Sequence, residues 1–264
     1  MSTHLLPRRT FLCSTAAALG ALLPRRAAAA PSADEIIGRI LEQDPWGLSG
    51  ADVSARVLIK GGGKTRELSF RARSRRYAPR LAKSLVRFTA PADVSGTGFL
   101  QIQKADGDDE RHLYLPELKK ARRIAGASRK SSFMGTDFSY GDLDRRDLRD
   151  AKAKVLATEK LGSHDAYKLE AIPTGADPLY ARMEVWARAE DLVPMKWHFY
   201  AASGAHVKTL VAKGIKKVEG RLFIVESTMS SLADGRTTDL VLEKVVPLDT
   251  APDDEFTVRS LEKT

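Results

Sequence analysis

The side chains that most often do chemistry are scattered along this chain without the spacing that a reaction needs. Beyond the first thirty residues the histidines are His112, His164, His198 and His206, and no two of them form an HxH or HExxH pair that would hold a metal. No GxSxG turn is present to expose a nucleophilic serine. We therefore expect a protein that is not an enzyme and that uses no metal and no cofactor.

Three weaker signals have ordinary structural explanations. The run GGGKT at 61–65 resembles part of a phosphate-binding loop, but it stands between two predicted strands, whereas a phosphate loop opens a helix. Asp106, Asp108 and Asp109 crowd a turn, and a solvated hairpin tip explains them more simply than a calcium site. Asp142 and Asp144 are close in sequence, but nothing orients them as a catalytic pair.

The first thirty residues have the pattern of a targeting segment. Arg8-Arg9 and Phe11-Leu12 precede an alanine-rich apolar run, 13–23, and four alanines at 27–30 supply the small residues of a cleavage site. The run is shorter than the ~20 residues that span a bilayer, and the arginine pair is typical of twin-arginine export. We expect residues 1–29 to be a twin-arginine-type signal peptide, cut after Ala29, and the mature protein to reside in the periplasm.

The composition limits the remaining classes. With 43% hydrophobic and 29% charged residues, the chain is expected to fold around a core of its own. The formal net charge of +9 is spread along the sequence, which indicates a solvated basic surface and no nucleic-acid partner. The only cysteine, Cys13, lies in the predicted signal peptide, so the mature chain has neither a disulfide nor a thiol nucleophile.

Apolar and polar residues alternate with a period of two from Ala51 onward, which predicts strands. The expected strands are 53–59, 68–72, 81–89, 98–104, 111–115, 152–160, 166–172, 180–189, 195–201, 206–213, 222–230 and 236–246. One helix precedes them, capped by Ser32 with Glu35 and ended by Asp44-Pro45. About a dozen strands with short turns predict a single antiparallel sheet over residues 30–264 that curls to hide its edges.

Residues 119–147 do not alternate, and we expect no strand there. A basic run opens the segment, with Lys119, Lys120, Arg122, Arg123, Arg129 and Lys130. It is either a solvated edge or a contact for anionic lipid headgroups. The stretch 131–143 then crowds Phe133, Met134, Phe138 and Tyr140 among glycines and small polar residues. A long loop of this kind is commonly a lid or binding loop, but a fixed plug would bury the same side chains, so both interpretations stay open.

The run SFMGTDFSY at 132–140 resembles the hallmark of periplasmic outer-membrane lipoprotein-sorting proteins related to the carrier LolA. RFTAPADVSGTGFL at 87–100, LYLPELKK at 113–120, the pair at 185–186 with LVPMK at 192–196, and DDEFT at 253–257 follow in that family's order. The resemblance spans Ala33 to Leu261. It implies a mostly β fold, a half-open antiparallel β-barrel with an N-terminal helix and a lid loop or short helix over a hydrophobic cavity.

The resemblance also implies a function. It indicates a carrier that binds the acyl chain of a lipoprotein or another lipid, takes it from an inner-membrane donor, and passes it to an outer-membrane acceptor without being an integral membrane protein. The candidate ligand-binding residues are Phe70, Phe88, Leu100, Ile102, Leu113, Leu115, Phe133, Met134, Phe138, Tyr140, Met183, Val185 and Trp197. An arginine holds the lid of related carriers, and the sequence does not single out its counterpart.

Two other functions fit the sequence. One is an accessory binding subunit of an envelope (RND-type) lipid exporter, with a filled core and no free carrier role. The other is an exported hydrolase, which the absence of a nucleophile–base motif makes the weakest of the three.

Overall fold

The computed structural model describes residues 30–43, 50–78, 81–143, 146–248 and 251–263. The predicted signal peptide and the expected helix end at Asp44-Pro45 lie outside these residues. Within the described part, no helix is long and apolar enough to cross a lipid bilayer.

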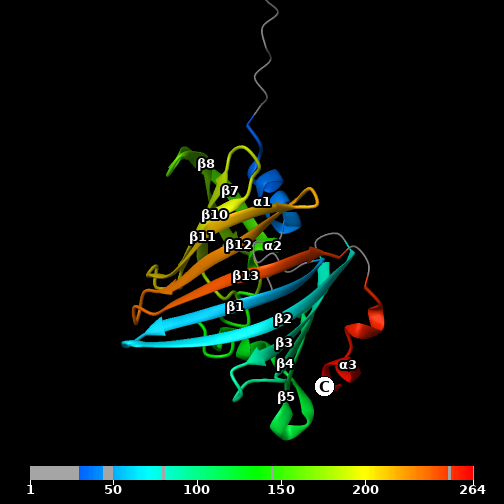
Figure 1. The fold of residues 1–264 in the computed structure, drawn as a ribbon. Coiled ribbons are helices and arrows are strands. Elements are labelled where there is room, and N and C mark those ends of the chain that lie inside the picture. Colours follow the sequence, from blue (N-terminus) through cyan, green and yellow to red (C-terminus); the bar gives the residue numbers. More distant parts are fainter. Residues whose placement is uncertain (1–29, 44–49, 79–80, 144–145, 249–250, 264) are drawn as a thin grey trace, which may run out of the picture. The chain divides into compact units, whose positions relative to one another are not determined.

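Thirteen antiparallel strands form one sheet in the order β6-β5-β4-β3-β2-β1-β13-β12-β11-β10-β9-β8-β7 (Figure 1). The strands are β1 Ala51–Gly61, β2 Lys64–Ala78, β3 Leu81–Ala90, β4 Gly98–Ile102, β5 Glu110–Leu115, β6 Lys120–Arg123, β7 Ala151–Leu161, β8 His164–Pro173, β9 Arg182–Arg188, β10 Pro194–Tyr200, β11 His206–Val218, β12 Arg221–Ser231 and β13 Thr237–Pro247. This mostly β fold with its N-terminal helix confirms the predicted class.

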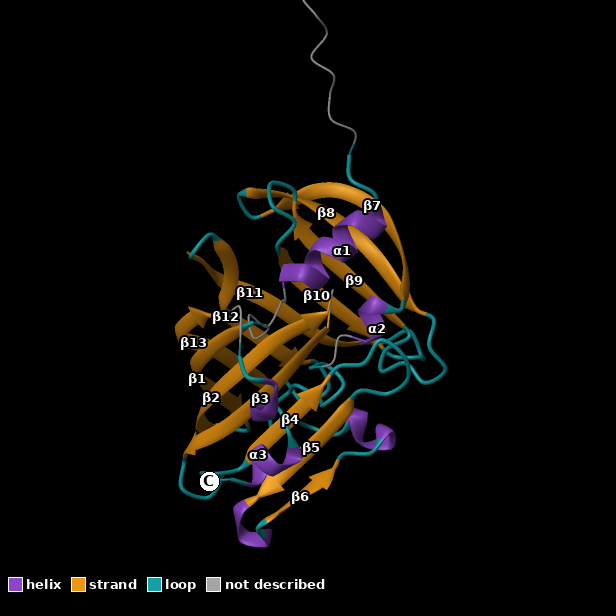
Figure 2. Ribbon diagram, turned by 90° about the vertical axis from the view of Figure 1, so that its right-hand side faces the viewer, coloured by secondary structure: helices purple, strands orange, loops and turns teal. Residues whose placement is uncertain are grey.

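The sheet is a simple meander apart from one long-range pairing at its midline. Each strand pairs with its neighbours in sequence, but β1 also pairs with β13, so that Val57 lies opposite Leu240. The sheet curls without closing: β6 and β7 are its two edges, and Figure 2 shows them at opposite ends of the curl. The result is the half-open barrel expected from the sequence.

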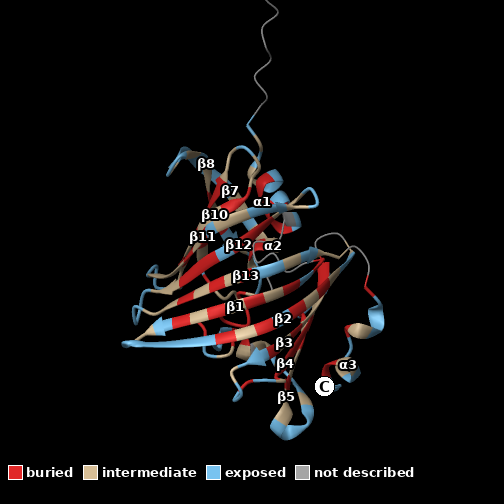
Figure 3. Cartoon of the chain, in the orientation of Figure 1, coloured by how far each residue is buried: buried red, intermediate tan, exposed pale blue. Residues whose placement is uncertain are grey.

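The alternating pattern has the predicted physical effect. In β1, Val53, Ala55 and Val57 are buried, while the residues between them are half-buried. Figure 3 shows this alternation as red and tan bands along β1. Gly62 and Gly63 have φ of 56° and 72°, which a two-residue hairpin turn requires and which glycine adopts without steric cost.

Helix α1 (Ala33–Gln43) begins with the predicted capping box. The Glu35 amide donates to the Ser32 hydroxyl at 3.2 Å, and the Ser32 amide donates to the Glu35 carboxylate at 2.7 Å. These bonds to Ser32 lower the pKa of Glu35. The apolar face of the helix is buried against strands β7 to β12, which form the second half of the sheet. This face consists of Ile36, Ile37, Ile40 and Leu41.

The expectation that residues 119–147 hold no strand was wrong at β6. Four residues, Lys120–Arg123, pair with β5, although all but Ala121 are charged. The outward amide of Ala121 donates to the Glu262 carboxylate at 2.9 Å. Helix α3 (Val258–Glu262) therefore stabilises an edge that apolar alternation could not reveal, and the 3₁₀ turn η3 (Asp253–Glu255) precedes it.

Two hydrophobic clusters fill the inner side of the curl. The first interior cluster lies on β1 to β4, β12 and β13 and includes Phe70, Phe88 and Phe99. The second interior cluster lies on β8 to β11 under α1 and includes Met183, Val185 and Trp197. A third, separate cluster joins Leu100 and Tyr114 to Phe256 and Leu261 at the C-terminus.

Candidate functional site

Residues 131–143, the segment singled out in the sequence, form a tight hairpin-like loop. The Phe133 amide donates to the Phe138 carbonyl at 2.8 Å, and the Thr136 amide donates to the Phe133 carbonyl at 3.0 Å. Met134 and Gly135 at the turn have φ of 53° and 80°. Consecutive positive φ angles are typical of a type I′ hairpin turn, and they explain the glycine at 135.

The aromatic side chains at both ends of this segment belong to the first interior cluster. The Phe133 ring centroid lies 5.2 Å from that of Phe99, 5.9 Å from Phe88 and 5.4 Å from Tyr140. Ring pairs at these separations add to the stability that burial provides. In this half of the barrel the segment fills the interior.

Polar contacts hold the tip of the segment against the midline of the sheet. Buried Asp137 accepts a hydrogen bond from the Thr238 hydroxyl at 2.6 Å, and its own amide donates to that hydroxyl oxygen at 2.9 Å. Arg236 donates to the Gly135 carbonyl at 2.5 Å and lies 3.6 Å from the Asp137 carboxylate. Arg236 thus contacts two residues at the tip of the segment, and the sequence did not single it out.

The end of the segment is fixed by a buried carboxylate, Asp142. It accepts from the Ser139 amide at 2.7 Å and the Ser139 hydroxyl at 2.8 Å. It also accepts from the Tyr180 hydroxyl at 2.7 Å and from the Lys208 ammonium at 3.0 Å. Burial, with Asp142 beside it, raises the pKa of Tyr180, so the phenol stays protonated and donates.

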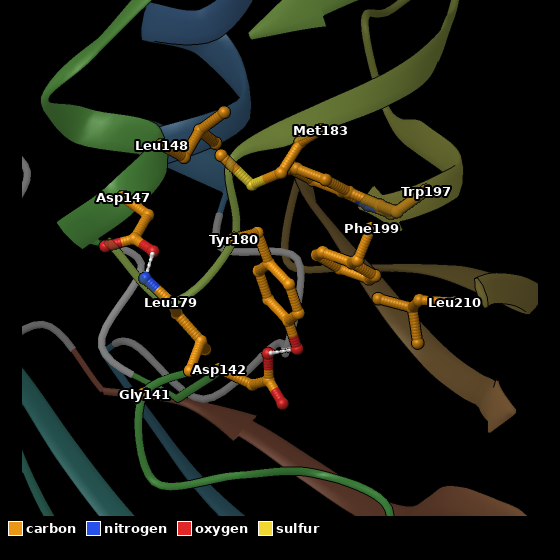
Figure 4. Close-up of a pocket in the computed structure, with 10 residues that line it drawn as sticks. All are labelled: Gly141, Asp142, Asp147, Leu148, Leu179, Tyr180, Met183, Trp197, Phe199 and Leu210. Atoms are coloured by element: carbon orange, nitrogen blue, oxygen red, sulfur yellow. Dashed lines mark hydrogen bonds between the residues drawn. The ribbon is translucent and has the colours of Figure 1, made fainter. Parts of the chain in front are cut away.

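A pocket opens directly beyond Asp142, inside the second interior cluster (Figure 4). Its lining residues are Gly141, Asp142, Asp147, Leu148, Leu179, Tyr180, Met183, Trp197, Phe199 and Leu210. The empty volume is about 440 Å³ including the solvent at its mouth, and the walls lie close enough to leave little room for free water. An apolar lining with a few polar groups is typical of a small-molecule site.

The pocket is built from distant parts of the chain. Its walls come from β9, β10 and β11, where Trp197 and Phe199 face inward with parallel rings at 6.1 Å. One side comes from the short helix α2 (Arg146–Arg149), which supplies Asp147 and Leu148. Asp147 accepts from the Leu179 amide at 2.5 Å and from Arg129 at 2.8 Å, so the loop before β9 and the basic run are fastened to this helix.

The structure places the predicted ligand-binding residues in several environments. Phe70, Phe88, Phe133 and Tyr140 belong to the first interior cluster, and Met134 packs on it. Phe138, Met183, Val185 and Trp197 belong to the second interior cluster. Leu113 pairs in register with Phe99 and so shares its inner face, with Leu115 two residues further along the same face. Of the candidate residues, only Met183 and Trp197 line the pocket.

Leu100 and Ile102 are not brought to this interior. They lie in the third cluster, under the C-terminal segment, because they point to the opposite face of β4 from Phe99. Sequence reasoning missed Phe99, Tyr180, Phe199 and Leu210 as interior residues. For Phe199 the signal was present, since it stands two residues after Trp197 on the same strand and therefore on the same face.

The basic run is divided between two environments. Lys119, Lys120, Arg122 and Arg123 are exposed at the β5–β6 edge. Arg129 is buried, and it donates to Asp147 and to the Asp177 carbonyl at 3.0 Å. Lys130 pairs with Asp177 at 3.2 Å. The first half of the run is therefore exposed at an edge of the sheet, whereas Arg129 in the second half is buried.

Solved structures share this architecture. A DUF1329 family protein from Desulfovibrio piger ATCC 29098 matches with a TM-score of 0.78 and 26% identity over 87% of this chain and 98% of its own. A candidate outer membrane lipoprotein-sorting protein domain from Vibrio parahaemolyticus matches with 0.78 and 26% over 86% and 98%. A LolA superfamily protein from Nitrosomonas europaea, with 0.69 and 20% over 86% and 98%, shows the fold alone.

The half-open sheet, its N-terminal helix and the inserted segment define the class: this is a LolA-like fold, as the sequence resemblance indicated. A family model described as "-like: Uncharacterized protein" matches residues 80–263, and the chain belongs to that family. No curated protein matches the chain in sequence.

Proposed function

We propose that this protein is a non-enzymatic periplasmic carrier that holds the acyl chain of a lipoprotein or another lipid in its second interior cluster. The observation that carries the proposal is the apolar pocket between β9–β11 and the segment ending at Asp142. The name of the Vibrio parahaemolyticus relative, a lipoprotein-sorting domain, supports the same class of cargo. The signal-like pattern of residues 1–29 supports the periplasm, which cell fractionation tests directly.

Burial of a hydrocarbon chain supplies the binding energy. Each CH₂ removed from water contributes about 0.8 kcal/mol, so even eight carbons in the pocket contribute about 6 kcal/mol before ordering costs. A longer chain needs more room than the present pocket offers. We infer that the segment 131–143 moves, withdrawing Phe138 from the second interior cluster to make that room and returning when the lipid leaves.

The test is a substitution that adds a larger side chain to the pocket and removes none from the core. Leu179 is half-buried at the pocket wall, so Leu179→Trp adds bulk where the lipid would lie. We expect this variant to lose uptake of a fluorescent fatty acid while its circular dichroism is unchanged. The matched control is Leu232→Trp, because Leu232 is 49% exposed and is not part of the pocket lining.

Two results would remove the carrier proposal. One is equal uptake by Leu179→Trp, Leu232→Trp and the parent protein. The other is a folded parent protein that yields no lipid by mass spectrometry of its organic extract and takes up no fatty acid.

A second candidate is favoured by the first interior cluster, which is filled by aromatic rings. If the second interior cluster is equally closed in solution, the fold serves as an accessory binding subunit of an envelope lipid exporter. The fatty-acid measurement separates the two, since only the carrier takes up lipid on its own.

A further inference from the structure

The indole of Trp197 is a buried polar group with an unusual position. Its side chain lines the pocket, and the residue is 5% exposed. Among the described residues, its Nε1–H has no hydrogen-bond partner. Buried donors are nearly always paired in native proteins, and an unpaired one costs about 1–3 kcal/mol. We therefore expect the acceptor for this donor to be a group outside the described part of the chain.

The other polar side chains of the pocket already have partners. Asp142 accepts hydrogen bonds from Ser139, Tyr180 and Lys208, so the Tyr180 hydroxyl already donates to Asp142. Asp147 accepts from the Leu179 amide with one oxygen and from Arg129 with the other. The Trp197 indole is therefore the one polar group of the described lining with an unused donor. Its Nε1 is itself closed to solvent, so a ligand reaches it only when the pocket widens.

We propose that the lipid held in this pocket is an acyl chain whose ester or amide carbonyl oxygen accepts a hydrogen bond from Nε1 of Trp197. The inference rests on the proposed carrier function and specifies the ligand of that same site. An indole N–H is a donor only, so its partner must be an acceptor. A carbonyl at the head of an acyl chain is the acceptor that enters an apolar pocket at the lowest cost, because it is neutral.

Charge in the pocket favours this neutral head group over an anionic one. Two carboxylates, Asp142 and Asp147, belong to the lining. The cations nearest to them, Lys208 and Arg129, are bonded to those same carboxylates. A free carboxylate or phosphate drawn to the depth of Trp197 would meet like charge and lose its hydration, so a bound fatty acid keeps its carboxylate at the mouth of the pocket. The carbonyl can come from two sources, the acylated cysteine of a lipoprotein or a glycerolipid.

The experiment compares an ester with a hydrocarbon of matched chain length. Methyl palmitate and heptadecane are bound to the parent protein and to Trp197→Phe by displacement of a fluorescent fatty acid. The ratio of the two affinities is compared between the proteins, so differences in ligand solubility cancel. We expect the replacement to reduce the ester-to-alkane ratio by about tenfold, the size of one hydrogen bond to a buried group.

Trp186→Phe is the matched control. Trp186 is also buried, but its Nε1 donates to Glu159 and it is not part of the pocket lining, so the ratio should equal that of the parent protein. The indole ¹⁵N–¹H resonance of Trp197 provides a second measurement. It should shift on addition of methyl palmitate and stay near its unbound position with heptadecane.

The outcomes separate this inference from the carrier proposal. Binding of neither ligand overturns the carrier function itself. If both ligands bind and the ester-to-alkane ratio is equal in the parent protein and Trp197→Phe, only the proposed hydrogen bond is overturned. The protein is then a carrier in which water accepts from the Trp197 indole. Displacement of methyl palmitate by a triacylated lipopeptide, or by phosphatidylethanolamine, supports the inference and identifies the source of the carbonyl. Displacement by neither overturns it.

Discussion

The two interior clusters are lined by the same kinds of residue but differ in how completely they are filled. In the first interior cluster the rings of Phe88, Phe99 and Phe133 lie within 6 Å of a neighbouring ring, and the segment 131–143 completes the packing. In the second, α1 and Phe138 cover the sheet but leave the pocket beside Met183. One loop therefore serves as a filler in one half and as the boundary of a pocket in the other.

This difference shows that an apolar strand face does not by itself make a binding site. Both halves of the sheet turn hydrophobic side chains inward, and both are covered by the same segment. The second half differs in that two carboxylates belong to the lining of its pocket. Through their hydrogen bonds, Asp142 and Asp147 join the end of the segment 131–143 and helix α2 to the strands and loop around the pocket.

The largest effect is expected from truncating the two phenylalanines of the segment. Phe133→Ala and Phe138→Ala should each lower the free energy of unfolding by about 3–5 kcal/mol, since both rings are buried. Only Phe138→Ala should recover stability when fatty acid is added, because Phe138 belongs to the cluster that contains the pocket and bound ligand stabilises the folded state. Urea unfolding with and without ligand measures both quantities.

Equal recovery in the two variants would contradict the contrast between the clusters. It would mean that the first interior cluster also admits lipid once a ring is removed. Recovery in neither would mean that the segment is a fixed plug.

A smaller effect is expected from the contact that fastens the tip of the segment. Thr238→Val keeps the shape of the side chain but leaves Asp137 without its 2.6 Å donor, at a cost of about 1–3 kcal/mol. The segment should open more often, so uptake of a fluorescent fatty acid should become faster in stopped-flow measurements.

The neighbouring change, Thr237→Val, is the control for this variant. Thr237 is half-buried and points to the opposite face of β13, so neither stability nor uptake rate should change appreciably. Faster uptake in Thr238→Val alone ties the opening of the second interior cluster to the segment. Unchanged uptake in both variants would show that the second interior cluster opens independently of the segment.

The smallest effect is expected at the helix that covers the second interior cluster. Ser32→Ala removes the hydroxyl that accepts from the Glu35 amide and should lower the free energy of unfolding by about 1 kcal/mol. Since α1 contributes to the second cluster only, hydrogen exchange should increase at the inward residues of β8 and β9 more than in β1 and β2. A uniform increase would show that the two halves unfold as one unit.

Most of the sheet could be predicted from the sequence because its strands have one buried and one solvated face. The period of two located twelve of the thirteen strands, and the capping residues located α1. Strand β6 was not predicted, because its stability comes from pairing with β5 and from a contact with Glu262, far along the chain. No local hydrophobic pattern records such a contact.

The site was only partly predictable for a related reason. Gly98, Phe99, Leu100 and Gln101 are all buried, since β4 has the first interior cluster on one face and the C-terminal segment on the other. Alternation cannot tell which face is the interior when both are covered, so Leu100 was chosen where Phe99 lies inside. The Asp142–Tyr180–Lys208 cluster brings together three stretches that no sequence spacing connects.

The pairing of β1 with β13 has a consequence for how the protein is made. Lys60 lies opposite Thr237 and Asp52 opposite Val246, so the middle of the sheet joins the start of the domain to its end. Contacts that span so much of a chain form slowly. Until the last strands emerge from the ribosome, β1 has an open hydrogen-bonding edge, and a chaperone has that interval in which to shield it from other chains.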